Sequence, residues 1–299
     1  MRLRAASFNI RNGKAWDGLD SWPLRRRATA EAVARLLPDI VGLQEAHRFQ
    51  ERYLLRRLPG FAACGAGRDD GRERGERCAI LYDTRRLVVE RWATRWFSDT
   101  PDIAGSVSWG ARPPRVATLA WFREHGVPPA PPAPTRFAVA DVHWDGASAD
   151  ARRRSAEALL TWIDDGLPWI VLGDLNTTCE DASVRRLLAA GLRDPLATLG
   201  AGGPGAGTHH RWDGRTDWTR IDFVLVTKEW RVHEAAIVQE SVHGRLPSDH
   251  WPVLADLELG NEGQAEEEDA ICRTTRDDRA PLSSREDPTH VTPGEKEDP

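Results

Sequence analysis

The chain has 299 residues, of which 41 are Lys or Arg and 46 are Asp or Glu, so its formal net charge is −5. Apolar residues make up 40% of the sequence and charged residues 29%, which is typical of a globular protein. No run approaches the roughly 18 consecutive apolar residues of a membrane-spanning helix, and the charged N-terminal segment predicts no secretory signal. We therefore expect a cytoplasmic protein without a membrane span, and we expect a monomer. The four cysteines form no CxxC pair, which argues against a cysteine-based zinc site.

The negative charge is concentrated at the C-terminal end of the sequence. Residues 260–299 contain 12 acidic and 5 basic residues, which leaves 34 acidic and 36 basic residues in 1–259. Few residues of this C-terminal segment are aromatic or β-branched, so it cannot bury enough apolar surface to offset the entropy of ordering. We predict one folded domain over residues 1–259 and a disordered acidic tail over residues 260–299.

Short apolar runs, separated by polar turns, recur along the predicted domain. Nine of them are four to eight residues long and rich in Val, Ile, Leu or aromatic residues, which is typical of strands. In chain order they are Leu3–Phe8, Ile40–Gln44, Cys78–Tyr82, Val116–Phe122, Phe137–Val142, Trp169–Leu172, Ile221–Val226, Ala235–Gln239 and Val253–Leu259.

Three other segments have the periodicity of amphipathic helices. They are Leu24–Leu37, which Pro38 ends, Ala151–Ile163, for which Asp150 is the expected N-cap, and Val184–Leu188. We expect the arginine runs Arg25–Arg27 and Arg152–Arg154 to form solvated outer faces of the first two helices. The run Pro128–Pro134 cannot join a sheet, because Pro lacks the N–H group, and should form an exposed loop. Since many strands follow one another without a helix, two packed sheets with helices outside are favoured over a doubly wound fold.

Polar residues end several of the apolar runs or follow them directly. They are Asn9, Glu45, His143, Asp174, Asn176, Asp222, Asp249 and His250. Because strand ends on one side of a sheet converge, we expect these side chains to form a single site. Bunched carboxylates repel one another unless a cation or a proton intervenes, and oxygen donors suit hard ions such as Mg²⁺ or Mn²⁺. Histidine adds proton transfer near pH 7, so the combination predicts phosphoester hydrolysis.

Taken one at a time, these residues have structural alternatives. A single strand-end Asp is more often a turn or N-cap residue, and Asn9 alone would be a turn former. The occurrence of all eight together is what favours a catalytic site.

The motifs that contain these residues resemble those of the endonuclease/exonuclease/phosphatase superfamily, also called the DNase I-like fold. The motifs SFNIR, LQE, CAILYD, VHWD, GDLN, RIDFVLV and SDHWPV occur in the order of that family between about residues 3 and 259. The resemblance implies an α/β fold of four layers, in which two packed, mostly antiparallel sheets are flanked by helices.

The resemblance also implies a role for each residue. The residues that match the family's metal site are Asn9, Glu45 and Asp249, with Mg²⁺, or alternatively Mn²⁺, as the cofactor. The residues that match its catalytic positions are Asp174, which orients or deprotonates water, Asn176 and His143, which contact the phosphate, and His250 with its partner Asp222. Residues that we expect to contact the substrate are Arg115, Trp144, Thr208 and His209.

We therefore expect a Mg²⁺-dependent phosphoesterase in which water attacks phosphorus in line. The substrate stays open at this point, and a nuclease acting on DNA or RNA is one alternative, while a hydrolase for a small or lipid-linked phosphoester is the other. The near-neutral charge of residues 1–259 does not favour a wide basic groove for nucleic acid. A catalytically silent metal-binding scaffold is a third alternative, against which the complete set of ligands argues.

Overall fold

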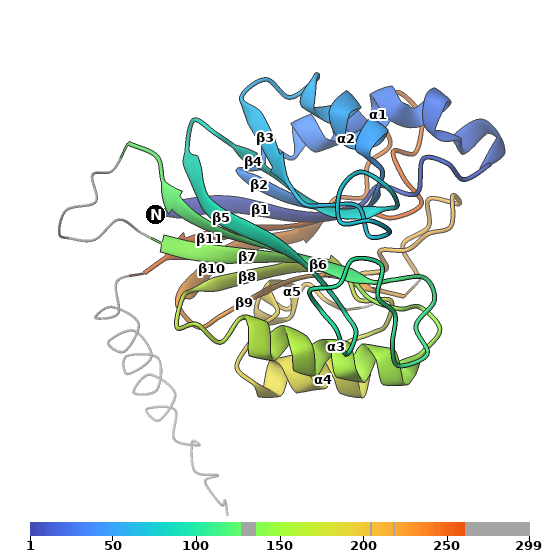
Figure 1. The fold of residues 1–299 in the computed structure, drawn as a ribbon. Helices are drawn as coiled ribbons and strands as arrows, with labels where there is room; N and C mark the ends of the chain where they lie inside the picture. Colours follow the sequence, from blue (N-terminus) through green and yellow to red (C-terminus); the bar gives the residue numbers. More distant parts are fainter. Residues whose placement is uncertain (127–135, 204, 218, 261–299) are drawn as a thin grey trace, which may run out of the picture. The chain divides into compact units, whose positions relative to one another are not determined.

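The computed structural model describes residues 1–126, 136–203, 205–217 and 219–260. Two β-sheets pack face to face in this part of the chain (Figure 1). The first sheet contains, in spatial order, β10 (Trp230–Ile237), β11 (Val253–Leu259), β1 (Arg2–Asn9), β2 (Ile40–Ala46), β4 (Arg77–Asp83) and β3 (Phe61–Cys64). The second contains β5 (Leu87–Trp96), β6 (Val116–Glu124), β7 (Arg136–His143), β8 (Trp169–Asp174) and β9 (Asp222–Val226).

Most neighbouring strands are antiparallel, and each sheet also contains one parallel pair, β1–β2 and β7–β8. Helix α1 (Trp22–Arg35) lies between the strands of the first pair in sequence, and α3 (Ala149–Trp162) lies between those of the second. In register, Asn9 lies opposite Gln44, and His143 lies opposite Asp174. Because β1 also packs against β8, and β2 against β7, the carboxyl ends of both parallel pairs meet between the sheets.

Helices cover the outer faces of the two sheets, as Figure 1 shows. Helices α1 and α2 (Arg48–Leu55) lie on the first sheet, and α3 and α4 (Ala182–Ala189) lie on the second. Two shorter elements, η1 (Gly18–Asp20) and α5 (Pro195–Thr198), complete the set, and α5 packs against β9 and β10. The four-layer α/β sandwich that the sequence predicts is thus confirmed. Helix α3 begins two residues earlier than expected, because Ser148, rather than Asp150, caps it by accepting a hydrogen bond from Ala151 N at 3.1 Å.

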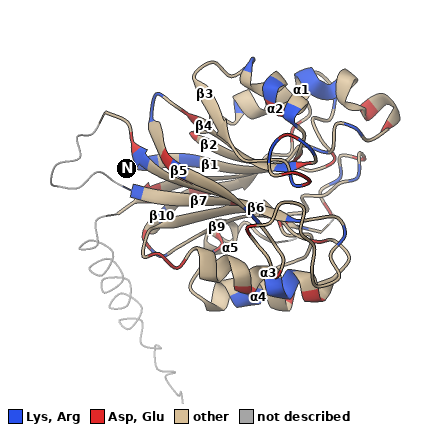
Figure 2. Cartoon of the chain, viewed as in Figure 1, with Lys and Arg blue, Asp and Glu red and all other residues tan. Residues whose placement is uncertain are grey.

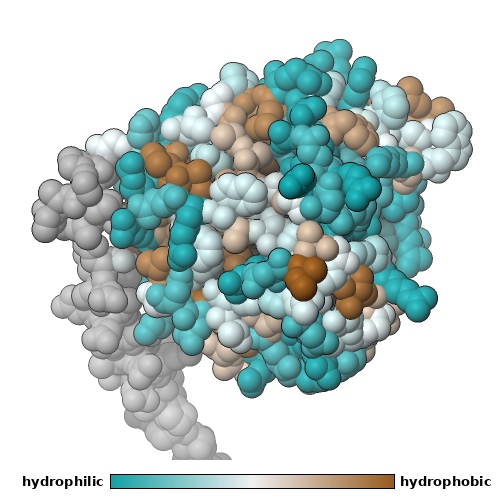
Figure 3. Space-filling model, viewed as in Figure 1, coloured by the Kyte–Doolittle hydropathy of each residue, from teal (hydrophilic) through white to brown (hydrophobic). Residues whose placement is uncertain are grey.

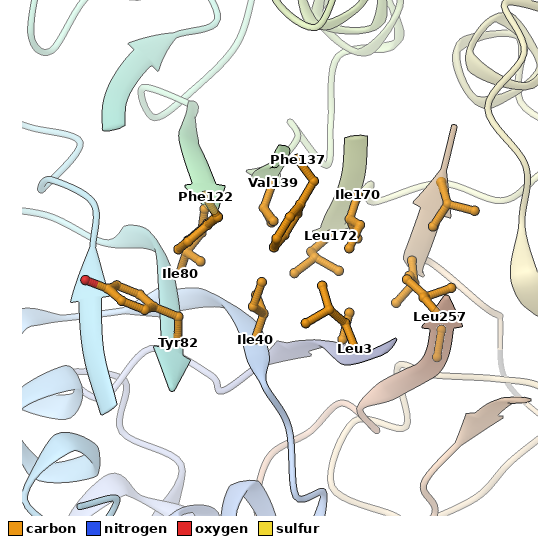
Figure 4. Close-up of a cluster of buried hydrophobic side chains, with 14 of the residues drawn as sticks. Leu3, Ile40, Ile80, Tyr82, Phe122, Phe137, Val139, Ile170, Leu172 and Leu257 are labelled. Carbon is orange, nitrogen blue, oxygen red and sulfur yellow. The ribbon is translucent and has the colours of Figure 1, made fainter. Parts of the chain in front are cut away.

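The largest core lies between the two sheets. Figure 4 shows side chains such as Ile40, Ile80, Phe122, Phe137 and Leu172 pointing from both sheets into the same layer. Separate apolar clusters fill the spaces under α1 and α2 and under α3 and α4. Because both faces of a central strand are covered, every residue of β4 and of β8 is buried, which explains why these strands appear in the sequence as unbroken apolar runs.

The errors of the strand prediction lie at the edges of the sheets. Strands β3 and β5 were not predicted, and β10 begins five residues before the predicted Ala235. All three are edge strands, and β5 carries charged residues along a partly exposed face, so the alternation of a buried strand is blurred. Helix α2 was also missed. The Pro128–Pro134 run and the acidic tail lie outside the described residues. Among the helices that the structure describes, none has the length and apolarity needed to cross a bilayer.

Candidate active site

Asn9, the last residue of β1, joins two of the predicted acidic residues. Its side-chain Nδ2 donates hydrogen bonds to Asp174 Oδ2 at 2.9 Å and to Glu45 Oε1 at 3.2 Å, while its Oδ1 accepts one from Arg11 N at 2.9 Å. Asn9 and Asp174 are buried, and they belong to different sheets. The predicted site therefore forms where strand ends of both sheets meet, and not at the edge of one sheet.

Two residues of the site have left-handed backbone conformations, which are uncommon outside glycine. Glu45 has a φ of 59° and lies where the register of β2 with β4 shifts, and a bulge of this kind redirects a side chain. Its Oε2 accepts a hydrogen bond from Asn12 N at 2.7 Å. Asn176 has a φ of 52°, donates through its backbone N to Asp174 Oδ1 at 2.8 Å and donates through Nδ2 to Trp144 O at 2.9 Å. The local backbone thus fixes both side chains.

His250 and Asp222 form a buried pair. His250 Nδ1 donates to Asp222 Oδ2 at 2.8 Å, and His250 Nε2 lies 3.9 Å from Asp174 Oδ2. Burial disfavours the charged imidazole, but the Asp222 carboxylate outweighs it and raises the pKa of His250 to about 10. Burial, together with the negative charge of Asp222, raises the pKa of Asp174 to about 7. The site therefore places a protonated imidazole beside a carboxyl group that can accept a proton near neutral pH.

The raised pKa of His250 makes stability depend on pH. A histidine whose pKa is higher in the folded than in the unfolded protein contributes stability that is complete below about pH 6.5 and is lost as the pH rises toward 10. In EDTA, we expect the free energy of unfolding to fall by up to about 1.4 kcal/mol per pH unit within this window. Urea titrations between pH 6.5 and 9 would measure the slope, and Asp222→Asn should flatten it. An equal slope in both proteins would contradict the pairing.

His143 lies on the other side of Asp174. Its Nε2 is 3.7 Å from Asp174 Oδ2, and the side chain is nearly buried. Burial, together with the positive charges of Arg115 and Arg68, lowers the pKa of His143 well below its usual value. His143 is thus a neutral imidazole at pH 7, whereas His250 is charged, so the two histidines flank one carboxyl oxygen in different protonation states.

The oxygen donors suit a hard divalent cation. Asp249 Oδ2 lies 3.7 Å from Arg11 Nε. The pKa of Arg11 is raised by its hydrogen bond to Asp17 and also by the charges of Asp249 and Glu45, so both carboxylates face the same region. Asp174, Asp222 and His250 offer ligand atoms within 4.8 Å of one another, and so do Asp249, His250 and His209. In this arrangement Asn9 turns its NH₂ group, rather than its oxygen, toward Glu45, so Glu45 and Asp249 are the better candidates for direct ligands.

Two residues expected to contact the substrate do not line the site. Trp144 is fully buried between β7 and the helices below it, because side chains alternate along a strand and His143 takes the face toward the site. Only the backbone of Trp144 reaches the site, through its bond to Asn176. Thr208 is also buried, and its Oγ1 accepts hydrogen bonds from Ile221 N and Asp222 N at 3.0 and 3.2 Å. Thr208 therefore positions the start of β9.

The other two predicted contact residues lie at the site. The His209 ring stacks on the His250 ring with centroids 4.4 Å apart, and its side chain is partly exposed. The Arg115 side chain is 12% exposed and lies beside His143 in the wall of a small hollow. Their positions are compatible with the predicted contacts.

The prediction of a solvated Arg25 is wrong. Its side chain is fully buried, and its guanidinium donates to Ile10 O at 2.8 Å, Arg11 O at 2.9 Å and Pro247 O at 3.1 Å. Burial lowers the pKa of Arg25 to about 10, so it stays charged at pH 7. Arg25 lies one turn after the buried Trp22, on the inner face of α1, and this spacing was the signal in the sequence. It ties the loop after β1 to the loop that carries Asp249 and His250.

Replacement of Arg25 should destabilise the protein strongly. Arg25→Met would leave Ile10 O without a donor, whereas Arg11 O and Pro247 O would each keep one donor, Gln50 Nε2 and Thr29 Oγ1. An unsatisfied buried group costs about 1–3 kcal/mol. We expect a loss of about 1–3 kcal/mol in the free energy of unfolding, measured by urea denaturation. The matched control is Arg27→Met on the exposed face of the same helix, for which we expect a change within about 0.5 kcal/mol.

Two supporting residues were missed by the sequence analysis. Ser248 is buried, and its Oγ donates to Asn9 O at 2.7 Å, which connects the Asp249 loop to the end of β1. Asn12 holds Glu45 through its backbone and donates through Nδ2 to Glu76 Oε1 at 2.6 Å. Both residues stand inside or beside the motifs SFNIR and SDHWPV, so their position was the available signal.

A profile of the Endonuclease/Exonuclease/phosphatase family matches residues 6–250. The chain belongs to this family. Among solved structures, an endonuclease/exonuclease/phosphatase family protein from Bacteroides thetaiotaomicron is 28% identical, with a TM-score of 0.78 over 88% of this chain and 96% of that one. A mannosyl-6-phosphatase from the same organism is also 28% identical, with a TM-score of 0.77 over 86% and 100% of the two chains. No curated protein matches the sequence.

A more distant neighbour shares the fold alone. The human Nocturnin catalytic domain is 19% identical, with a TM-score of 0.66 over 87% of this chain and 95% of that one. The family match over residues 6–250 confirms the resemblance seen in the sequence motifs. Members of the family are hydrolases that act on phosphoesters.

Proposed function

We propose that this protein is a Mg²⁺-dependent phosphoester hydrolase. The observation that carries the proposal is the surroundings of Asp174: one of its oxygens is hydrogen-bonded to Asn9 and flanked by two histidines in different protonation states. Burial raises the pKa of this carboxyl group to about 7, which suits it to hold and deprotonate a water molecule.

Each residue then has a defined part in the reaction. Asp174 orients the attacking water, and the neighbouring Asn176 backbone bond keeps its carboxyl group in place. His250, held in one orientation by Asp222, donates a hydrogen bond to a phosphoryl oxygen as charge builds up in the transition state. Glu45 and Asp249, with Asn9, would hold the metal ion, and a bound Mg²⁺ supplies positive charge for the phosphoryl and leaving-group oxygens. Mn²⁺ has similar preferences and is the alternative.

The distribution of charge favours a small phosphoester over a nucleic acid. Figure 2 shows basic and acidic residues interspersed over the helices and loops, rather than a continuous basic band. The face seen in Figure 3 is mostly hydrophilic, with only small, separate apolar patches. A nuclease would need positive charge along a bound strand. That one structural neighbour is a mannosyl-6-phosphatase agrees with a small substrate. A cytoplasmic monomer stays a prediction from the sequence.

A panel of phosphoesters, assayed with Mg²⁺ and with EDTA, tests the proposal. It should contain p-nitrophenyl phosphate, bis-p-nitrophenyl phosphate, sugar and inositol phosphates, sphingomyelin, and single- and double-stranded nucleic acid. We expect hydrolysis of at least one small phosphoester, dependent on the metal and abolished in Asp174→Asn. The control is Glu180→Gln, which removes an exposed carboxylate from the surface. Hydrolysis that persists in EDTA, or in Asp174→Asn, would contradict the mechanism, and cleavage of nucleic acid alone would favour a nuclease.

A further inference from the structure

A small hollow lies beside the active site, behind His143. It is lined by His143, Arg115, Arg68 and Glu76, and also by the buried residues Cys78 and Val116. The space inside is about that of one water molecule. His143 also lies 3.7 Å from Asp174, so one side chain borders both the hollow and the reacting centre.

Arg115 brings to this hollow a cation that has no hydrogen-bonded acceptor among the described residues. Its Nε lies 3.6 Å from Asp145 Oδ2, but the oxygens of Asp145 already accept hydrogen bonds from the backbone N atoms of Arg112, Ala147 and Ser148. Within the described residues, the Arg115 guanidinium makes no hydrogen bond, although its side chain is only 12% exposed. A buried guanidinium without an acceptor is costly, and in a binding site this usually marks the place of an anionic ligand.

A second guanidinium, that of Arg68, faces the same space. Arg68 pairs with Glu76, which also accepts a hydrogen bond from Asn12, and the Nε atom of Arg68 is buried without an acceptor. The backbone of Arg68 is held in place, because its N donates to Glu76 O at 2.9 Å and its O accepts from Trp96 Nε1 at 2.7 Å. Both arginines act electrostatically on His143, as its lowered pKa indicates. Asp69 and Glu76 lie within salt-bridge distance of Arg68, and Asp145 lies within that distance of Arg115, but the Arg115 guanidinium is hydrogen-bonded to none of them.

Resting on the proposed function, we infer that the substrate is a phosphomonoester, with one unesterified phosphoryl oxygen bound at the mouth of this hollow by Arg115 and His143. Charge is the first reason, since a monoester dianion gains more from the two guanidiniums than a diester monoanion does. Size is the second reason. The hollow admits an oxygen atom but not a carbon substituent, so a diester could bind only with its second ester group turned away from the hollow, whereas a monoester has no such restriction.

The test compares two esters that share a leaving group. p-Nitrophenyl phosphate and methyl p-nitrophenyl phosphate differ only in a methyl group on one phosphoryl oxygen. With Mg²⁺, we expect the wild-type protein to have the higher kcat/KM for the monoester. Arg115→Gln should lower kcat/KM for the monoester by about 100-fold and that for the diester by less than about 5-fold, so the ratio between them collapses. Arg115→Lys should restore part of the ratio, because it keeps the charge but not the planar donors.

Two controls separate this inference from the proposed function. Arg123→Gln removes a partly exposed arginine from the other end of β6 and should leave the ratio unchanged. Calorimetric titration with inorganic phosphate measures the anion site without turnover, and Arg115→Gln should raise the phosphate Kd at least about 10-fold. Thermal unfolding checks that each variant is folded.

The possible outcomes distinguish the two claims. If the wild-type protein prefers the diester, or if Arg115→Gln leaves both the ratio and the phosphate Kd unchanged, the inference is overturned while phosphoester hydrolysis stands. If neither ester is hydrolysed with Mg²⁺ and no phosphoester in the panel is, the proposed function fails, and the phosphate titration alone decides whether Arg115 binds an anion.

Discussion

His250→Ala is expected to lower kcat/KM for phosphoester hydrolysis by about 10³-fold or more. The imidazole is charged at pH 7 because Asp222 lies 2.8 Å from its Nδ1, and its Nε2 points toward Asp174, where the phosphoryl group would react. Removal of this group takes away a charged hydrogen-bond donor that interacts most strongly with the transition state. Steady-state kinetics on the best substrate of the panel would measure the loss.

The pairing with Asp222 makes this prediction sharper. If His250 acts only in the orientation and charge state that Asp222 gives it, Asp222→Ala should cause most of the same loss. The double variant should then be little worse than His250→Ala, because residues that act as one unit are not additive. The control is His233→Ala, which removes a partly exposed histidine of β10 that pairs with Glu258 of the neighbouring strand β11. Losses that multiply in the double variant would show that the two residues act independently.

Glu45→Gln is expected to weaken the binding of Mg²⁺ strongly. Glu45 has a strained backbone and is held by Asn9 and Asn12, so its carboxylate is fixed in the site before any ion binds. Gln has nearly the same size and shape as Glu, so the replacement removes one negative charge from the expected metal ligands without changing the volume of the side chain. We expect the Mg²⁺ concentration for half-maximal activity to rise by about 100-fold, and kcat at saturating Mg²⁺ to fall by about 10²-fold.

A binding measurement makes the second prediction independent of turnover. Titration of the wild-type protein with Mn²⁺ in a calorimeter should show a site that Glu45→Gln weakens and that Glu180→Gln leaves unchanged. Equal Mn²⁺ affinity in Glu45→Gln and wild type would exclude Glu45 as a ligand. In that case Asp249, with His209 and His250 beside it, would be the next carboxylate to test.

The strands in the middle of both sheets were predicted from the sequence, as was the edge strand β9, whereas the other edge strands, β3, β5 and β10, were missed or misplaced. Strands β4 and β8 are covered on both faces, so their central residues form an unbroken apolar run and leave a clear signal. Strand β5 has one neighbouring strand and a partly exposed face, so charged residues are tolerated and the signal is lost. A strand that is buried on both faces can thus be recognised from its own residues. An edge strand is defined mainly by its pairing with the neighbouring strand, which its own residues do not reveal.

The sequence by itself determined which chemical groups meet at the site, because polar residues directly after apolar strands must lie at the ends of a sheet. Only the tertiary structure decided what each group touches. It buried Trp144 and Thr208, turned Arg25 inward to three backbone carbonyls, and left Arg115 without a hydrogen bond beside His143. The physical reason is that burial and hydrogen bonding are set by residues distant in the chain. Asp145, for example, accepts hydrogen bonds from three backbone N atoms, while the Arg115 guanidinium, whose Nε is 3.6 Å away, makes no hydrogen bond to it.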